Sequence, residues 1–373
     1  MKTLRGGWPL CAVLLILSLF SLSFVALGES ATEITPQEKK LIPLAKKEGG
    51  FTFINANLLD PTMRRMQAAF IKRYGLGDDF KFNYVLKGTG PTVATARQEI
   101  KAGKFSFDSV MVAAAGFFAG AAKEGAFLPL DSGHWKNHEE LARKGGQFFQ
   151  YPYFLAVLPY TFQPVWNVSC PGMKDFKVTS YADVVNPALK GKTIASDVTK
   201  SASYSITVMG LIESGFDIMD FWKKLKATDP LVAFRTEAKM QLLVNCERSV
   251  DTWNVVGRAR QAIEKKPELA KSLRWGYYKE GMVLLAQQIA VPKGAPHPNA
   301  GKLFVEFLLT KEGTDIAVEG ELDYTFLKGY TPPESVKPYL LDLNTVKVLG
   351  LKDWVAGFEG FKKMRDDWSK ILR

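Results

Sequence analysis

Residues 290–313 read AVPKGAPHPNAGKLFVEFLLTKEG, which predicts a strand end, a tight turn and an amphipathic helix. Pro292 and Gly294 interrupt an apolar strand. Pro298 suits the first turn of a helix, where the missing N–H group costs no hydrogen bond. Apolar side chains then recur at the spacing of one helix face, and they are Ala300, Leu303, Phe304, Phe307 and Leu308. The stretch is typical of an α/β fold in which this helix is buried.

The same alternation of strands and helices extends back to the first third of the chain. The segments 51–55, 80–86 and 108–112 are apolar and short, as strands are. Residues 35–48 predict a first helix. Thr62 is expected to cap the next one, whose inner face carries Met63, Met66, Phe70 and Tyr74. Strands alternating with helices predict parallel βαβ units with right-handed crossovers.

The second half of the chain continues in the same style. Residues 192–196 predict a strand, and residues 273–278 and 282–291 predict extended chain. Helices are expected at 201–211, 217–226 and 252–265. At 373 residues the chain exceeds the size of one usual hydrophobic core, so we expect two domains.

Composition and charge narrow the function classes. The sequence is 47% hydrophobic and 23% charged, as soluble globular proteins are. The net charge of +11 comes from scattered basic residues, a pattern that does not favour nucleic-acid binding. A solvated basic surface explains it, as does attraction of anionic solutes. The sequence has no nucleophile elbow, phosphate-binding loop or Cys-x-x-Cys pair, so we expect neither an enzyme nor a cofactor.

The first 28 residues predict a signal peptide for export. Lys2 and Arg5 precede an apolar run over 10–27, and small residues favour cleavage before Glu29. An uncleaved membrane anchor is the alternative. An exported protein is expected to fold in an oxidising compartment. The two cysteines that follow the signal peptide, Cys170 and Cys246, therefore either form one disulfide or remain two unpaired buried thiols.

Two stretches carry a resemblance to a known family. PKGAPHPNAGKLFVEFLLTKEG in the late segment and SYADVVNPALKG at 180–191 resemble the solute-binding proteins of ATP-binding-cassette (ABC) importers. The branch containing ferric-ion-binding proteins is the most similar. The resemblance covers about residues 51–333. It implies a periplasmic, non-enzymatic protein that hands a small solute to an ABC permease in the inner membrane. A sensor subunit for a receptor kinase is an alternative.

The resemblance also implies a type II periplasmic-binding-protein fold, with two discontinuous α/β lobes joined by two crossover segments. The expected parts are a signal peptide at 1–28, a first lobe at 29–160 and 279–373, and a second lobe at 161–278. The chain is expected to cross between lobes within 145–167 and 273–291. Residues 340–373 are expected as peripheral helices on the first lobe.

The ligand site is expected where strands end and helices begin. Helix N-termini carry unpaired N–H groups and partial positive charge, so they suit anions. Turns rich in glycine or hydroxyl residues lie at 88–92, 196–203 and 251–254, although ordinary helix capping also explains them. The predicted ligand is a small anion such as a carboxylate, phosphonate or sulfonate. The predicted contacts are Asn55, Asn57, Gly88, Thr89, Gly90, Thr92, Ala114, Ala115, Ser196, Thr199, Ser201, Ala202, Ser203, Thr252, Trp253 and Asn254.

Ferric iron is the second candidate solute, and no metal site is predicted. The iron-binding branch uses a pair of tyrosines, whereas this chain has Thr252-Trp253-Asn254 at the similar position. Tyr277 and Tyr278 are neighbours in a strand-like segment, so their side chains should face opposite ways. Trp253 either stacks on the ligand or lies in the core. His134 and His138 could share a helix face, but without a third ligand we expect exposed polar residues.

Overall fold

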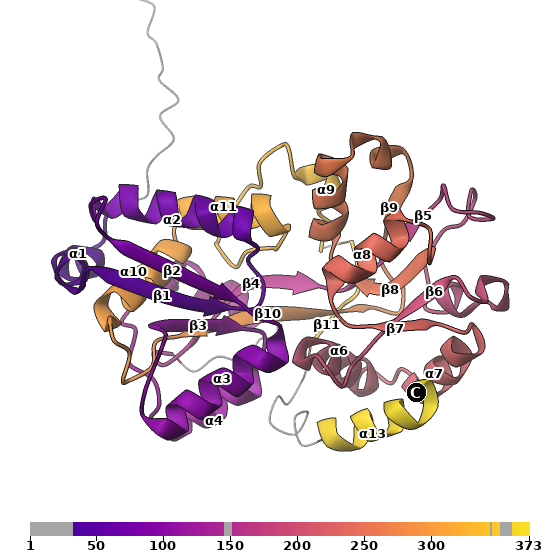
Figure 1. Cartoon of the computed structure of the whole chain (residues 1–373), viewed down its shortest axis with the longest axis horizontal. Coiled ribbons are helices and arrows are strands. Elements are labelled where there is room, and N and C mark those ends of the chain that lie inside the picture. Colours follow the sequence, from indigo (N-terminus) through magenta and orange to yellow (C-terminus); the bar gives the residue numbers. More distant parts are fainter. Residues whose placement is uncertain (1–32, 145–150, 344, 351–359) are drawn as a thin grey trace, which may run out of the picture. The chain divides into compact units, whose positions relative to one another are not determined.

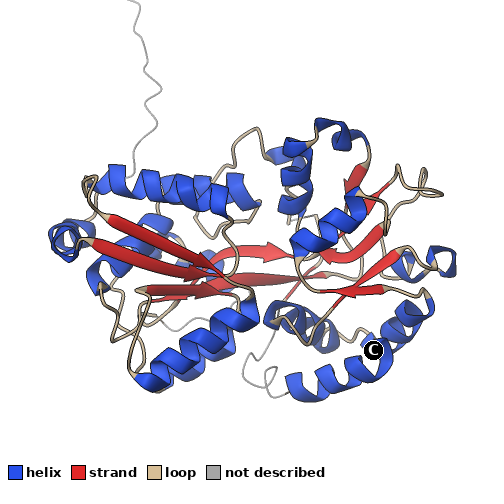
Figure 2. Cartoon of the chain, viewed as in Figure 1, coloured by secondary structure: helices blue, strands red, loops and turns tan. Residues whose placement is uncertain are grey.

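The computed structural model describes residues 33–144, 151–343, 345–350 and 360–373. The predicted signal peptide lies outside them. Within the unit Thr32–Arg373, the strands form two mixed β-sheets with helices packed outside the strands (Figures 1 and 2). We call each sheet with its helices a lobe. None of the helices in the described part of the chain has the length and apolar character needed to cross a membrane.

The first sheet has the strand order β11-β10-β3-β1-β2, and β4 also pairs with β10. Strand β1 is parallel to β2 and β3, whereas β10 runs antiparallel to β3 and β4. The bounds are β1 (Gly50–Asn55), β2 (Lys81–Leu86), β3 (Ser109–Val112), β4 (Leu155–Thr161), β10 (Met282–Ala290) and β11 (Val348–Leu349). The predicted parallel βαβ units are therefore present.

Seven helices of the described residues belong to the first lobe. They are α1 (Pro36–Glu48), α2 (Asp60–Tyr74), α3 (Thr89–Ala102), α4 (Ala115–Lys123), α5 (Glu139–Lys144), α10 (Pro298–Leu308) and α11 (Lys311–Glu321). Phe304 of α10 lies in the centre of this lobe, with its ring centroid 4.8 Å from that of Phe51 and 5.6 Å from that of Phe70. The stretch quoted first is thus a strand end followed by a buried helix, as predicted.

One cap was predicted wrongly. Helix α2 begins two residues before Thr62, with Leu59 as N-cap and no side-chain cap. Thr62 instead donates its Oγ1 hydrogen bond to Glu321 Oε1 at 2.6 Å. Asp60-Pro61 supplies the helix start, because proline fits the first turn. The predicted inner face of α2 is buried throughout.

The second sheet has the order β7-β6-β8-β5-β9. Its strands are β5 (Gln163–Asn167), β6 (Thr193–Ser196), β7 (Leu231–Ala233), β8 (Val250–Asn254) and β9 (Leu273–Trp275). Its helices are α6 (Ala202–Glu213), α7 (Ile218–Ala227), α8 (Thr236–Val244) and α9 (Val256–Lys265). The helix predicted over 252–265 begins later, because Thr252, Trp253 and Asn254 are the end of β8.

The chain crosses between the two sheets twice. Strand β4 ends at Thr161 and β5 begins at Gln163, so Phe162 alone separates a strand of the first sheet from one of the second. The return lies between Trp275 at the end of β9 and Met282 at the start of β10. Both crossings fall in the segments expected for them, although residues 145–150 are outside the described part. The predicted lobe boundaries remain a prediction.

The C-terminal helix lies on the other lobe from the one expected. Helix α13 (Phe361–Leu372) packs its apolar face into the second-lobe core with α6 and α7 (Figure 1). Trp368 is 1% exposed there. The expectation that residues 340–373 pack on the first lobe is therefore wrong for α13, because its apolar stripe matches the α6–α7 surface. Strand β11 does stay with the first sheet.

Of the two alternatives for the cysteines, the structure has the disulfide. Cys170 and Cys246 are bonded, with Cα atoms 5.4 Å apart. The bond joins the loop after β5 to the turn that follows α8. It therefore fastens one side of the second sheet to a helix whose N-terminus reaches the candidate site described next.

Candidate functional site

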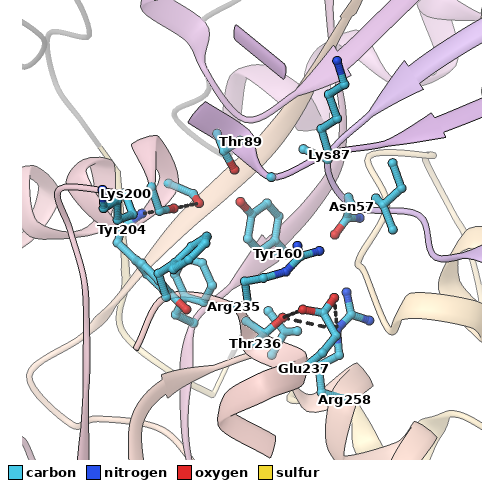
Figure 3. A pocket seen from close by; sticks show the side chains of 18 of the residues that line it. Asn57, Lys87, Thr89, Tyr160, Lys200, Tyr204, Arg235, Thr236, Glu237 and Arg258 are labelled. Atoms are coloured by element: carbon cyan, nitrogen blue, oxygen red, sulfur yellow. Dashed lines mark hydrogen bonds and ion pairs between the residues drawn. The ribbon is translucent and has the colours of Figure 1, made fainter. Parts of the chain in front are cut away.

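A pocket of about 90 Å³ lies between the two lobes (Figure 3). The first-lobe wall consists of Ala56, Asn57, Leu86, Lys87, Gly88, Thr89, Tyr160 and Gln287. The facing wall consists of Phe162, Lys200, Ser201, Ser203, Tyr204, Phe234, Arg235, Thr236, Glu237, Val255 and Arg258. Most of these residues come from turns that follow strands, so the pocket is at the carboxyl ends of parallel strands, where α/β proteins bind ligands.

Four helices begin at this pocket. The N-caps are Gly88 for α3, Ser201 for α6, Arg235 for α8 and Val255 for α9, and all of them line it. Only the Ser201 side chain, among these four, accepts a hydrogen bond from its own first turn. The N-termini of α3, α8 and α9 therefore lack a side-chain acceptor and direct partial positive charge toward the pocket.

Cationic side chains outnumber acidic ones in the lining. Lys87, Lys200, Arg235 and Arg258 are basic, whereas Glu237 is acidic. Lys87 Nζ donates to Thr95 Oγ1 at 3.0 Å. Among the ion pairs of the described residues, none involves Lys87, Lys200 or Arg235. Lys200 and Arg235 are available to an anion in the pocket, whereas the Lys87 ammonium group is bonded to Thr95 on α3 and points away from the other labelled side chains (Figure 3).

Arg258 differs from the other three because its charge is already balanced. Its Nη1 lies 2.7 Å from Glu321 Oε2, and its Nε lies 3.4 Å from Glu237 Oε1. Burial alone would lower the pKa of Arg258, but the carboxylates of Glu321 and Glu237 outweigh this effect and raise it. Arg258 stays charged, and it neutralises the acidic residue that would otherwise repel an anion.

Two tyrosines supply neutral hydroxyl groups. Burial raises the pKa of both Tyr160 and Tyr204, so both remain protonated at neutral pH and can donate a hydrogen bond. Tyr204 donates weakly to the Trp253 carbonyl at 3.4 Å. Its ring centroid lies 4.4 Å from that of Phe162, the crossover residue. The floor of the pocket therefore contains aromatic rings, and one of them belongs to Phe162, where the chain crosses between the lobes.

One buried acceptor in the lining is unused. Gln287 on β10 is 2% exposed, and its Oε1 has no hydrogen-bond partner within the described part of the chain. The neighbouring Gln288, in contrast, accepts from the Ala114 N–H group through Oε1 at 2.9 Å. A buried acceptor without a partner costs free energy, on the order of 1–3 kcal/mol. A donor group on a bound solute would remove this cost.

A family model described as bacterial extracellular solute-binding protein matches residues 52–319. The chain belongs to this family. The match includes both sheets except β1's first residues and β11, and it includes every residue of the pocket lining. The prediction of a binding protein rather than an enzyme is thereby confirmed. No curated protein matches this solute-binding protein.

Solved structures share the fold of this solute-binding protein at low sequence identity. Iron-bound HitA from Pseudomonas aeruginosa has 17% identity and a TM-score of 0.68, over 86% of this chain and 99% of that one. A substrate-binding protein of an ABC transporter from Agrobacterium tumefaciens has 16% identity and a TM-score of 0.73, over 87% and 94%. AfuA from Actinobacillus pleuropneumoniae, solved with fructose-6-phosphate, has 19% identity and a TM-score of 0.70, over 87% and 98%. The predicted two-lobed fold is confirmed.

The structure brings part of the predicted contact set of this solute-binding protein into one pocket. The predicted residues that line it are Asn57, Gly88, Thr89, Ser201 and Ser203. Four others, Gly90, Ala114, Thr199 and Ala202, line a second pocket nearby. The remaining seven are buried and line neither pocket, and they are Asn55, Thr92, Ala115, Ser196, Thr252, Trp253 and Asn254.

The residues outside both pockets have structural partners in most cases. Asn55 Oδ1 accepts from the N–H groups of Asn57 and Leu58 at 3.0 and 2.8 Å, which shapes the turn after β1. Thr252 Oγ1 donates to the Ile194 carbonyl at 3.1 Å. Trp253 is 2% exposed in the second-lobe core. The predicted third turn is the end of a buried strand, which explains why its side chains do not reach the pocket.

The cations of the pocket were not predicted from the sequence. Lys87 directly precedes the first turn that was singled out, Lys200 lies within the second, and Arg235 precedes α8, a helix that was not predicted. A usable signal was present at α8. Met240 and Leu243 are apolar at helical spacing, and Thr236 with Glu237 is typical of a first turn.

The tyrosine pair and the histidines do not form a metal site. Tyr278 is buried, stacks on Tyr181 at 3.7 Å and donates to the Thr252 carbonyl at 2.6 Å, whereas Tyr277 is exposed. His134 and His138 were expected to be exposed, but they are buried against Glu38 and the Leu309 carbonyl, respectively. Among the described residues, no group of three or more His, Cys, Asp or Glu side chains is placed to hold a metal ion.

Proposed function

We propose that this solute-binding protein captures a small anion in the interlobe pocket and delivers it to an ABC importer. The observation that carries the proposal is that Lys200 and Arg235, with Lys87 at the edge, line a pocket at which α3, α8 and α9 begin without side-chain caps. Each source of positive charge is modest in water. Together, in a partly enclosed space, they favour an anion over a neutral solute.

The pocket fits a compact solute. Its volume of about 90 Å³ exceeds the roughly 10–15 Å³ that a single water requires, so it holds several waters or one compact solute. A phosphate, phosphonate, sulfonate or carboxylate with a short organic part has this size. A hydroxyl or N–H group beside the anionic group of the solute would supply a partner to the Gln287 amide, whose Oε1 has none among the described residues.

Ferric iron remains the second candidate, because iron-bound HitA shares the fold. The charge of the pocket argues against it. Three cations without carboxylate partners repel a trivalent cation. Burial also raises the pKa values of Tyr160 and Tyr204, so their phenolate forms, the oxygen ligands that ferric iron would need here, are disfavoured. AfuA, whose solved ligand is fructose-6-phosphate, is the neighbour whose ligand chemistry agrees better with the pocket.

The mechanism is binding and release without a bond broken. The solute contacts walls from both lobes, and the lobes are joined through Phe162 and the segment after Trp275. A bound anion would therefore hold the lobes together, and a membrane permease would recognise that form. Delivery to an importer is supported by the family and by the neighbour from Agrobacterium tumefaciens. Export by the predicted signal peptide would place the protein in the periplasm.

A thermal-shift screen with paired solutes tests the proposal. The pairs are fructose 6-phosphate with fructose, and ferric citrate with citrate, alongside inorganic phosphate and short phosphonates. A millimolar solute with micromolar affinity stabilises the protein by about 4 kcal/mol. We expect at least one anion to raise the melting temperature while its neutral counterpart does not. A shift produced by ferric citrate and by no iron-free anion would refute the proposal in favour of iron.

A further inference from the structure

A second pocket, of about 190 Å³, lies beside the first. Gly90 and Val93 of α3 line it from the first lobe, and Thr199 and Ala202 line it from the second. A Cβ added to Gly90 would lie 3.4 Å from the Lys200 carbonyl oxygen, so α3 of the first lobe and this turn of the second lobe are in ordinary van der Waals contact. Lys200 lines both pockets. The two pockets thus adjoin at Lys200.

Three cations border the second pocket without a carboxylate in the lining. They are Lys200, Arg97 of α3 and Arg365 of α13. Among the ion pairs of the described residues, none involves any of the three. The nearby carboxylate of Asp197 is already paired, since its Oδ2 lies 2.5 Å from Arg373 Nη2. The positive charge facing this pocket is therefore not neutralised by the protein.

The geometry of the two arginines suits a carboxylate. The guanidinium of Arg97 lies over the Phe117 ring at 5.7 Å, and that of Arg365 lies over the Phe361 ring at 5.3 Å. Arg365 Nε donates to Ser205 Oγ at 2.9 Å, which fixes the side chain while leaving its Nη groups for other acceptors. A guanidinium held in this way presents a fork of N–H groups that matches a planar anion.

The remaining walls of the second pocket are apolar. Phe117 and Phe361 are 5% and 7% exposed, and Val93 and Ala114 complete this surface. An apolar wall next to unpaired cations favours a ligand with both characters over a fully hydrated inorganic ion. Burial also lowers the pKa of Arg365, and the Asp197 charge offsets this only in part. A bound anion would supply the missing compensation.

We propose that the second pocket is a binding site for a small organic anion that carries a carboxylate on a compact apolar body. The carboxylate contacts Arg97, Lys200 and Arg365, and the apolar body packs on Val93, Phe117 and Phe361. Helix α13 lies outside residues 52–319, the part that the family model matches. The site depends on this helix, and it shares Lys200 with the first pocket.

Titration of the mature chain with 4-fluorobenzoate, followed by fluorine NMR, tests the proposal. We expect saturable binding that weakens about 10-fold or more in Arg365→Gln and in Arg97→Gln, because each removes a charge-assisted contact. Lys362→Gln is the matched control, since Lys362 is an exposed cation on α13 outside the lining. It should leave the affinity unchanged. Arg97 is exposed, so its variant remains informative if Arg365→Gln disturbs the packing of α13.

Three results would overturn the proposal. One is the absence of saturable binding. Another is binding that Arg235→Gln abolishes while Arg97→Gln and Arg365→Gln do not, because the probe then occupies the first pocket. The third is inorganic phosphate displacing 4-fluorobenzoate with equal affinity, because the apolar wall then contributes nothing.

Discussion

Arg258 on α9 and Glu321 at the end of α11 form a buried ion pair between the two lobes, with Nη1 and Oε2 2.7 Å apart. Glu321 also accepts hydrogen bonds through Oε1 from the Leu59 N–H group at 2.8 Å and from Thr62 Oγ1 at 2.6 Å. It therefore caps α2 while holding α9. Gly257 makes the close approach possible, since a Cβ there would lie 2.0 Å from the Glu321 carbonyl oxygen. This contact fixes the start of α9 at the edge of the pocket.

Arg258→Ala should destabilise the protein strongly. The substitution leaves the Glu321 carboxylate buried without its cation, and breaking a buried pair in this way costs about 3–5 kcal/mol. Urea unfolding monitored by circular dichroism measures the change. Lys265→Ala is the control, because Lys265 is exposed on the same helix. If Arg258→Ala and Lys265→Ala have the same midpoint, the pair does not stabilise the interlobe contact.

Arg235→Gln should weaken binding of the anion found by the solute screen. Arg235 lines the pocket and forms no ion pair within the described residues, so its loss should leave the fold intact. A charge-assisted hydrogen bond contributes about 1.5–3 kcal/mol, which corresponds to roughly 10- to 100-fold in affinity. Isothermal titration calorimetry measures this loss of affinity. Repeating the titration at a second salt concentration measures how far salt screens the attraction between Arg235 and the anion.

Arg274→Gln is the matched control for Arg235→Gln. It makes the same change of charge at an exposed arginine on β9 that does not line the pocket. Equal losses of affinity in the two variants would mean that the overall positive charge, rather than Arg235 itself, attracts the anion.

The strands and the principal helices of the first lobe could be predicted because their apolar spacing is strong and local. Phe51, Phe70 and Phe304 each lie in a regular pattern, and each is buried where its pattern places it. Helix α8 has weak amphipathic character and was missed, and with it Arg235. The lobe on which α13 packs depends on surfaces formed by residues that are distant in the sequence. The local pattern of α13 does not reveal which of these surfaces it fits.

The pocket could be predicted as a region but not residue by residue. Glycine and hydroxyl turns mark the carboxyl ends of strands, and Gly88, Thr89 and Ser201 from these turns line the pocket. Whether a given hydroxyl faces the pocket or its own backbone depends on where the helix begins within one or two residues. Thr252 illustrates this limit, since it is in β8 and bonds to the Ile194 carbonyl.

Removal of the disulfide should destabilise the second lobe. The bond between Cys170 and Cys246 closes a loop with a sequence separation of 76, which corresponds to about 4 kcal/mol in the chain-entropy treatment. The double variant Cys170→Ser, Cys246→Ser should show this loss in urea unfolding. Adding a reductant should lower the midpoint of the wild-type protein and leave that of the double variant unchanged. A reductant effect on both would point to a cause other than this bond.

Glu306 on α10 should make stability fall as pH rises toward neutrality. Burial raises its pKa from 4.5 to about 7, although the hydrogen bond from Ser132 and the charge of His134 oppose the shift. Its two carboxyl oxygens also lie 3.2 Å from the Gly133 N–H group. The folded protein therefore holds a proton that the unfolded chain has already lost between pH 4.5 and 7. The free energy of unfolding decreases across this window, by about 3 kcal/mol at most.

Glu306→Gln tests this effect because glutamine retains the shape and cannot ionise. Urea unfolding at pH 5 and at pH 8 measures the free energy of unfolding of both proteins. Relative to the wild type, the variant should be more stable at pH 8 than at pH 5. The buried Glu38 provides an opposite reference. Burial alone would raise its pKa, but hydrogen bonds from His134, Tyr74 and the Thr35 N–H group lower it to about 2. Its stabilisation is lost only as pH falls from about 4.5 toward 2. Parallel pH profiles for the wild type and Glu306→Gln between pH 5 and 8 would show that Glu306 is already ionised in the folded protein at pH 5.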